Sequence, residues 1–264
     1  MKRIDHKKKF YEKLPFPILI TTAVIPNDIN SVKLNDYKER RKYILEAVKN
    51  WQIIAPNIEI IICDGSNFCL KNYFQLNRIN TYNIEFLKFQ NNENLVRIYG
   101  KGFGESEIIR YALENSSTLK NYSHFAKCTG KLWIKNFHKI IYSFKNEPCL
   151  FRPYFAFSIS KKFKIDHIDT RFYIINKQLY INNFLNIYSG AEPGKSIENL
   201  FLEKIQQLKL KNIFFKIFII ISGTSGASGK LYNTKFYRVI KDSIKYHFWK
   251  KMASFDRPYL DLNK

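Results

Sequence analysis

The chain has 264 residues, and its 44 lysines and arginines exceed its 22 acidic residues, so the formal net charge at pH 7 is +22. Hydrophobic residues make up 45% and aromatic residues 16% of the sequence, which excludes an intrinsically disordered protein and provides enough apolar surface for a large core. The charge favours nucleic acid, an anionic membrane or a phosphorylated substrate as partner, although the lysine- and isoleucine-rich composition alone accounts for about half of it.

The first 130 residues alternate between predicted strands and predicted helices. Apolar runs predict strands at residues 18–24, 57–63, 84–89 and 125–128. Apolar side chains at helical spacing predict a helix over residues 35–51, and a second helix over 105–115 follows a glycine-rich turn. This alternation indicates βαβ units, so the expected fold class is α/β, with a mainly parallel, Rossmann-type central sheet flanked by helices.

The second half of the chain is less regular. It contains predicted strands at residues 150–160, 170–175 and 213–221, and predicted helices at residues 196–208 and 234–252. The last helix has apolar residues on one side and basic residues elsewhere; the apolar ones are Phe236, Ile240, Ile244 and Phe248. We therefore expect one domain over residues 1–233, followed by a basic amphipathic helix and tail over residues 234–264.

The sequence predicts a cytoplasmic protein. No apolar leader follows its basic first nine residues, and its most apolar run, at 213–221, is shorter than the about 20 residues that span a bilayer. Its four cysteines form no Cys-x-x-Cys pair, so free thiols in a reducing compartment are expected.

Asp64 is the first candidate site residue. It ends a buried apolar strand and begins an Asp-Gly-Ser turn. Open α/β sheets bind ligands at the carboxyl ends of their strands, where a carboxylate can accept hydrogen bonds from a ribose hydroxyl or a base N–H. An ordinary Asp-Gly turn explains the same residues equally well.

A second candidate is the segment that begins with Lys101. Gly102 and Gly104 would let the backbone approach a ligand closely, the start of the following helix offers free N–H groups, and Lys101 adds positive charge. Together these features suit a phosphate. The alternative is a plain loop in which Glu105 and Glu107 are favourable charges in the first helical turn.

A third candidate is Thr129-Gly130-Lys131, which follows a short strand in the middle of the chain. Lys131 could reach a pyrophosphate from there. His124 and Cys128 lie nearby, but no second ligand pair has the spacing of a zinc site, so no metal site is expected.

Residues 190–196 resemble a phosphate-binding Walker loop, but their glycines are four residues apart instead of five and a proline interrupts them. We therefore reject a P-loop. The adjoining Ser196 can cap a helix that carries Glu198 in its first turn. A carboxylate in that place either stabilises the helix dipole or serves as a general base at a cleft.

Two further segments carry polar side chains that could meet a substrate. Asp169 and Arg171 lie at the start of an apolar strand and suit either sugar hydroxyls or a surface ion pair. Ser225 and Ser228 belong to a Gly/Ser loop at 222–229 that follows the predicted strand 213–221. Because the chain has only 10 glycines, three in this loop favour a ligand-facing segment over a flexible linker.

The order of these motifs resembles the bacterial family 2-type glycosyltransferases of the GT-A fold. In that family, a first strand like the one ending in Thr21-Thr22 is followed by a strand that ends in Asp-Asp-Gly-Ser and binds the nucleotide. Asp64 fills that position, with Cys63 in place of the first Asp. The family's Glu-Asp base pair is approximated by Glu198-Asn199, and the resemblance extends over most of residues 16–233.

The main departure from the family is the missing Asp-x-Asp metal motif, because Thr129-Gly130-Lys131 stands in its place. The resemblance then implies metal-independent, inverting transfer from a nucleotide-sugar donor, with no cofactor and with Lys101 and Lys131 neutralising the leaving diphosphate. Glu198 would be the general base, and Asp169 its alternative. The donor would be contacted by Thr21, Thr22, Asp64, the 101–104 segment and the 129–131 turn. The acceptor would be contacted by Arg171, Ser225 and Ser228.

The closest resemblance is to surface-polysaccharide glycosyltransferases, which build capsule, O-antigen or lipooligosaccharide. It implies a glycan or lipid-linked glycan acceptor. The basic face and the aromatic residues of the last helix suit peripheral association with the inner face of the cytoplasmic membrane, and a helix that packs on the sheet with a solvated basic face explains them equally well. A nucleic-acid-binding or -modifying protein is the alternative suggested by charge, but no such module is recognisable and no nucleic-acid partner is expected. A non-catalytic interaction protein would leave the glycine loops at strand ends unexplained.

Overall fold

The structure is a computed structural model that describes residues 14–26, 33–158, 161–226, 228–232 and 235–255. Its centre is a six-stranded sheet with the strand order β3-β2-β1-β4-β7-β6. The first four strands along the chain are parallel to one another: β1 (Ile18–Thr22), β2 (Ile60–Asp64), β3 (Ile84–Lys88) and β4 (His124–Thr129). β7 (Lys161–Asn176) runs antiparallel to β4, and β6 (Cys149–Ser158) pairs with β7 at the sheet edge.

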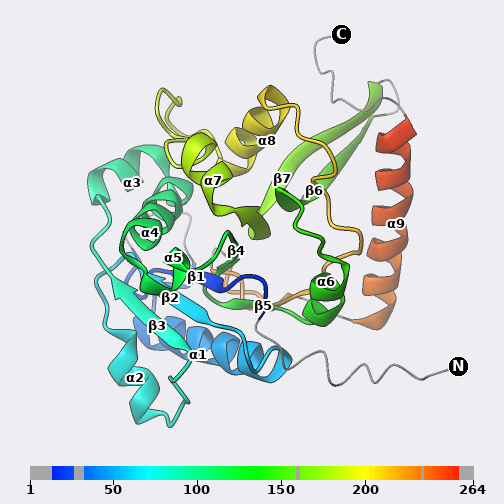
Figure 1. Ribbon diagram of the computed structural model, residues 1–264. Coiled ribbons are helices and arrows are strands. Elements are labelled where there is room, and N and C mark those ends of the chain that lie inside the picture. Colours follow the sequence, from blue (N-terminus) through cyan, green and yellow to red (C-terminus); the bar gives the residue numbers. More distant parts are fainter. Residues whose placement is uncertain (1–13, 27–32, 159–160, 227, 233–234, 256–264) are drawn as a thin grey trace, which may run out of the picture.

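Helices cover both faces of this sheet (Figure 1). One hydrophobic core lies under α1 (Tyr37–Ile54), α2 (Leu70–Leu76) and α6 (Phe137–Ser143), with Trp51 fully buried at its centre. The second core lies on the other face, under α4 (Lys101–Asn115), α5 (Ser117–Lys120), α7 (Lys177–Asn183) and α8 (Ile197–Gln207). α3 (Glu93–Tyr99) directly precedes α4. The α/β class, the mainly parallel sheet and the flanking helices are therefore confirmed.

A small second sheet pairs β5 (Leu132–Ile134) with β8 (Ile221–Gly223) in antiparallel register. The predicted strand at 213–221 is wrong except for its last residue. Phe214 forms only an isolated bridge to Phe151, and the segment is irregular although Phe215 and Ile219 are buried. The apolar run was correctly assigned to the core, but burial alone does not distinguish a strand from a buried irregular segment.

α9 (Phe236–Phe255) stands beside β6 and β7, as the red and orange helix in Figure 1 shows. It is anchored by Tyr246, whose hydroxyl donates to the carbonyl of Phe215 over 2.6 Å, and Lys250 Nζ donates to the same carbonyl. Of the predicted apolar side, Ile240, Ile244 and Phe248 are exposed. Within the described part of the chain, no helix combines the length and apolarity needed to cross a bilayer.

The register of the sheet brings three strand ends to one edge. Thr22 lies opposite Asp64, and Thr21 lies opposite Thr129, so β2, β1 and β4 end side by side. The sequence-predicted residues on these strands therefore meet at the carboxyl edge, where α/β sheets bind ligands.

Candidate functional site

Asp64 organises the loops at the carboxyl edge. Its buried carboxylate accepts five hydrogen bonds from the end of β1 and from the loops that follow β1 and β2: Thr22 Oγ1, Val24 N, Ser66 N, Ser66 Oγ and Phe68 N, at 2.6–3.1 Å. These donors occupy both carboxylate oxygens. Asp64 therefore holds the two loops together, and any ligand at this edge would meet loops whose shape Asp64 sets.

Arg40 supports the same region and was not recognised in the sequence. Its buried guanidinium donates from Nε and Nη2 to the carbonyl of Ala23 and from Nη1 to that of Leu34. Burial lowers its pKa to about 10, and the negative charge of Asp64 opposes that shift. The arginine thus fixes the chain that leaves β1 while leaving a positive charge near Asp64.

A buried ion pair lies in the middle of the edge. Lys127, in β4, is completely buried, and its Nζ lies 2.5 Å from Oε1 of Glu105. The same ammonium donates to Thr129 Oγ1 and to the carbonyl of Thr170. Glu105 Oε1 also accepts from Thr21 Oγ1 at 3.0 Å and from Thr129 Oγ1 at 3.3 Å.

This cluster joins two predicted site residues, Thr21 and Thr129, to two that were missed. The sequence signal for Lys127 was a lysine inside an otherwise apolar strand, because a buried lysine requires a partner. Glu105 was read only as a favourable charge in a first helical turn. Its partner, 22 residues later in the chain, could be identified only from the tertiary structure.

Lys131 is a third buried basic residue at this edge, after Arg40 and Lys127. Its residue is 4% exposed, and its ammonium makes no hydrogen bond among those described for residues 14–26, 33–158, 161–226, 228–232 and 235–255. Burial and, to a smaller extent, the charge of Arg40 lower its pKa to about 7, although the charges of Asp64 and Glu105 oppose this shift. An unpartnered lysine in this position is suited to meet an anion.

The turn that carries Lys131 requires its glycine. A Cβ on Gly130 would lie 2.5 Å from Thr22 Cγ2 and 2.8 Å from the Thr21 carbonyl, which accepts from Gly130 N. From the other side, Gly226 approaches so closely that a Cβ there would lie 3.2 Å from Lys131 Nζ. The Gly/Ser loop therefore lies against the Lys131 ammonium.

Within that loop, the serines make local bonds. Ser225 Oγ accepts from Ser228 N, and Ser225 N donates to the carbonyl of Lys230. Ser228 is exposed. Their expected contact with an acceptor stays a prediction.

The predicted phosphate turn at Lys101 is wrong as a turn. α4 begins at Lys101, after Gly100 in the left-handed region at φ 84°, so Gly102 and Gly104 lie inside the helix. Both are buried: a Cβ on Gly102 would lie 2.3 Å from the Tyr188 hydroxyl, and one on Gly104 would lie 2.9 Å from the Asn91 side chain. These glycines permit close packing of α4, and Lys101 itself is exposed.

Glu198 has the position predicted for it. Ser196 caps α8 by accepting from Asn199 N, which places Glu198 in the first turn. Glu198 lines an open hollow of about 390 Å³ together with Asp166, His167, Ser196 and Asn199. Its Oε1 accepts from Thr170 Oγ1 at 3.3 Å, and the carbonyl of Thr170 is bonded to Lys127, so the hollow adjoins the buried cluster.

Asp169 is not available as the alternative base. It is buried and bonded to Arg171 through both carboxylate oxygens, at 2.7 and 2.8 Å. Burial raises the pKa of Asp169, but the hydrogen bonds and charge of Arg171 outweigh this, and the pKa is lowered. Arg171 also donates to the Tyr154 hydroxyl and lies over the Tyr232 ring. The pair is structural, as the ion-pair alternative predicted, although buried.

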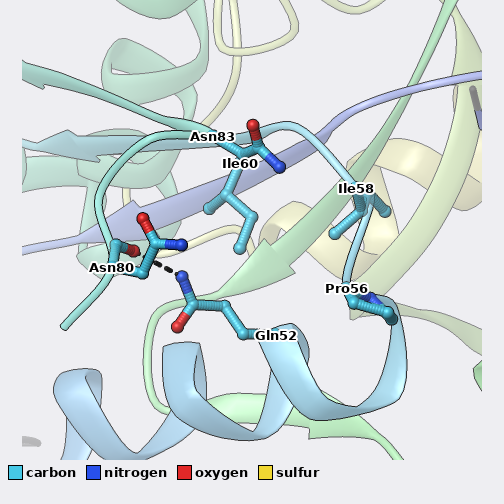
Figure 2. Close-up of a pocket in the computed structure, with 6 residues that line it drawn as sticks. All are labelled: Gln52, Pro56, Ile58, Ile60, Asn80 and Asn83. Carbon is cyan, nitrogen blue, oxygen red and sulfur yellow. Dashed lines mark hydrogen bonds between the residues drawn. The ribbon is translucent and has the colours of Figure 1, made fainter.

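A second hollow, of about 180 Å³, lies at the opposite, amino edge of the sheet. Figure 2 shows its lining between the end of α1 and the starts of β2 and β3, where Gln52 donates to the carbonyl of Asn80. It contains no charged side chain and lies away from Asp64, so it is not part of the candidate site. Among the described residues, no three His, Cys, Asp or Glu side chains are grouped to hold a metal ion.

No protein-family model and no curated protein matches the sequence. Solved structures align with most of the chain at low identity. A 4-diphosphocytidyl-2C-methyl-D-erythritol synthase from Anaerococcus prevotii is 11% identical, with 88% of this chain and 96% of that chain covered and a TM-score of 0.47. The bifunctional glycosyltransferase WbbM is 10% identical, with 92% of this chain but 45% of its own covered and a TM-score of 0.47.

The galactosyltransferase LgtC, solved with donor and acceptor sugar analogues, is 9% identical. The alignment covers 73% of this chain and 65% of LgtC, with a TM-score of 0.44. At these identities and TM-scores, the likeness carries no conclusion about activity or substrate.

Proposed function

We propose that this protein is a glycosyltransferase that moves a sugar from a nucleotide-activated donor to a hydroxyl of a growing surface glycan, such as capsule, O-antigen or lipooligosaccharide. The observation that carries the proposal is the Lys131 ammonium, buried without an assigned hydrogen-bond partner among the described residues at the carboxyl edge of the sheet. It occupies the position where the resembled family has carboxylates that bind a metal. The proposed reaction uses this cation in place of a metal.

In the proposed reaction, the diphosphate of the donor lies against Lys131, and the nucleoside lies along the loops held by Asp64. The acceptor enters the open hollow lined by Glu198 and His167. Its hydroxyl oxygen bonds to the anomeric carbon, its proton passes to Glu198, and the bond from that carbon to the phosphate oxygen breaks. The diphosphate leaves with the bonding electrons, stabilised by Lys131, and the sugar configuration is inverted.

Ligand protection tests the donor class. In a thermal-shift panel of UDP-, GDP-, CMP- and dTDP-sugars, we expect one nucleotide to raise the melting temperature, because a ligand that binds only the folded state stabilises it. CTP and dTTP distinguish a nucleotidyltransferase, which would respond to the triphosphate, and an oligonucleotide distinguishes a nucleic-acid binder. A response to the oligonucleotide alone would overturn the proposal.

Chelation tests the use of Lys131 in place of a metal. Once a donor is identified, we expect turnover to survive EDTA and to be unchanged by added Mn²⁺ or Mg²⁺. Loss of turnover in EDTA with recovery on addition of Mn²⁺ would show that a divalent ion neutralises the diphosphate, and the metal-independent mechanism would be wrong.

The proposed location is the anionic inner face of the cytoplasmic membrane, and α9 supports it. Its outward side combines exposed apolar residues with exposed lysines. The apolar residues are Tyr237, Ile240, Ile244 and Phe248, which are 42–65% exposed, and the lysines include Lys241 and Lys245. Apolar side chains that enter a bilayer surface beside lysines that meet anionic headgroups are typical of interfacial helices.

Vesicle flotation tests this location. We expect the protein to float with vesicles containing phosphatidylglycerol at low salt, more weakly at high salt, and to lose binding in Ile244→Glu. Ile53→Glu is the matched control, since Ile53 is an equally apolar, exposed residue on α1. No flotation at either salt concentration, or equal loss in both variants, would remove the membrane from the proposal.

A further inference from the structure

The two carboxylate oxygens of Glu105 have different environments. Oε1 takes every contact assigned to this side chain: the Lys127 ammonium at 2.5 Å and the hydroxyls of Thr21 and Thr129 at 3.0 and 3.3 Å. Oε2 has no assigned partner among the described residues. The Glu105 side chain is 19% exposed, whereas that of Lys127 is completely buried.

This asymmetry fixes the direction of the free oxygen. A carboxylate held at one oxygen by three donors, one of them a buried cation, loses most of its freedom to rotate. The desolvation of Lys127 is compensated only while Oε1 stays in place. Oε2 is therefore a pre-oriented hydrogen-bond acceptor at the exposed side of the cluster.

The surroundings of Glu105 point to what it accepts from. Along the edge, the neighbouring strands β2, β1, β4 and β7 contribute Asp64, Thr21, Thr129 and Thr170 in that order. Glu105 is bonded to the two central threonines. The Asp64 loops lie on one side of it, and Thr170, which is bonded to Glu198, lies on the other.

We propose that Oε2 of Glu105 accepts a hydrogen bond from a hydroxyl of the sugar being transferred, and that Lys127 is the positioning residue that holds this carboxylate. The inference rests on the proposed function. A transferred sugar has to lie between its diphosphate, at Lys131, and the base that activates the acceptor, at Glu198. Glu105 presents its acceptor oxygen from α4, beside the ends of β1 and β4. The turn that carries Lys131 directly follows β4, and Thr170, which is bonded to Glu198, lies on the neighbouring strand β7. Glu105 would therefore select donors by the hydroxyl they place there.

Calorimetric titration tests this inference by comparing the affinity for each nucleoside diphosphate with the affinity for the corresponding nucleotide sugars. The pairs are UDP with UDP-glucose, UDP-galactose and UDP-N-acetylglucosamine, GDP with GDP-mannose, and dTDP with dTDP-glucose. In wild type, we expect the productive nucleotide sugar to bind more tightly than its diphosphate. Because Glu105→Gln alone leaves the Lys127 ammonium buried without its carboxylate, the double variant Glu105→Gln/Lys127→Met carries the test.

We expect the double variant to bind the diphosphate as wild type does and to bind the nucleotide sugar about 10- to 100-fold more weakly, the usual range for a lost hydrogen bond to a charged group. Lys127→Met alone should show a smaller loss of the same selective kind. Glu107→Gln, in the same helix, is the matched control and should bind both ligands normally.

The outcomes separate the inference from the proposed function. If wild type binds none of these ligands and neither CMP nor CMP-sialic acid, the proposed function fails. If wild type binds them but the double variant weakens diphosphate and nucleotide sugar equally, Glu105 contacts the nucleoside or only supports the fold, and the inference is overturned. Unchanged sugar binding in the double variant would also overturn it.

Discussion

At the residue scale, the position of Glu198 suits both roles that a carboxylate can have at the start of a helix. It lies in the first turn of α8, where a negative charge is favourable, and it lines the open hollow. Its hydrogen bond from Thr170 fixes Oε1 and leaves the side chain half-buried. A base that takes a proton from an acceptor needs this combination of fixed direction and access.

We therefore expect Glu198→Gln to lower kcat by about 10²- to 10⁴-fold with donor affinity kept, because the amide keeps the shape but cannot take the proton. Initial rates and donor titrations measure the two effects. Glu203→Gln is the matched control on the same helix, where Glu203 pairs with Lys195 at the surface. Near-normal turnover in Glu198→Gln would place the base elsewhere.

Lys131 gives the site a pH dependence. Its pKa of about 7 means that the ammonium loses its proton as the pH rises through neutrality. A bound diphosphate favours the protonated form, so we expect UDP, or whichever diphosphate protects the protein, to bind up to about tenfold more weakly for each pH unit above 7. Lys131→Met should remove this slope, and Lys101→Met, at an exposed position, should keep it. A pH-independent affinity in wild type would contradict the assignment.

The same lysine affects stability in the absence of ligand. Between about pH 7 and its ordinary pKa of 10.5, the unfolded chain holds a proton on Lys131 that the folded protein has released. The destabilisation is therefore complete below pH 7 and fades as the pH rises. We expect Lys131→Met to raise the melting temperature by about 2 °C or more at pH 6 and by less at pH 9. Equal shifts at both pH values would mean that burial of charge is not the cause.

At the scale of elements, the contact between α4 and α8 depends on a missing side chain. A Cβ on Gly102 would lie 2.3 Å from the Tyr188 hydroxyl and 2.9 Å from Cβ of Ile197, the first residue of α8. We expect Gly102→Ala to lower the free energy of unfolding by about 1–3 kcal/mol through overpacking. Tyr188→Phe in the same chain should restore part of this loss by removing the hydroxyl. Denaturant titration of Gly102→Ala, Tyr188→Phe and the double variant measures the free energy of unfolding of each. An unchanged free energy of unfolding in Gly102→Ala would contradict the close contact at Gly102.

The sequence predicted elements well where one physical signal was sufficient. Buried parallel strands form continuous apolar runs, so β1 and β2 are predicted to within three residues of their ends. The edge strand β3 is only partly buried, and its apolar residues predict it within one residue. The start of α4 was placed four residues late, because glycines are poor helix formers and their packing against Tyr188 cannot be seen locally. The segment before β8 is predicted as a strand because its apolar composition is the only signal that the sequence offers there. Many buried strands share that composition, and so do buried irregular segments.

The candidate site was predictable only in part. The sequence predicts Thr21, Asp64, Lys131 and Glu198 as candidates because ligands meet the carboxyl ends of strands and the starts of helices, and the structure places them at or beside the carboxyl edge of the sheet. Both carboxylate oxygens of Asp64 are occupied by five hydrogen bonds from the end of β1 and from the loops after β1 and β2. No sequence pattern predicts these hydrogen bonds.

At the scale of the whole molecule, burial divides the four cysteines. Cys63, Cys128 and Cys149 are buried free thiols, and Cys69 is exposed. Burial raises the pKa of Cys128 and Cys149 to about 12 and also raises that of Cys63, so these three are both inaccessible and protonated. In a native Ellman titration, we expect one thiol to react and, in guanidinium chloride, four. Cys69→Ser should abolish the native reaction; further fast thiols in that variant would show that the buried ones open.

The Lys127–Glu105 pair has a consequence for how this protein can change through evolution. A chain that lost the glutamate alone would keep an uncompensated buried ammonium, and a chain that lost the lysine alone would keep a loosely held carboxylate. Either single step is costly, whereas a joint replacement by two uncharged residues is not. Positions 105 and 127 should therefore covary among homologues, with mixed charged and uncharged combinations depleted.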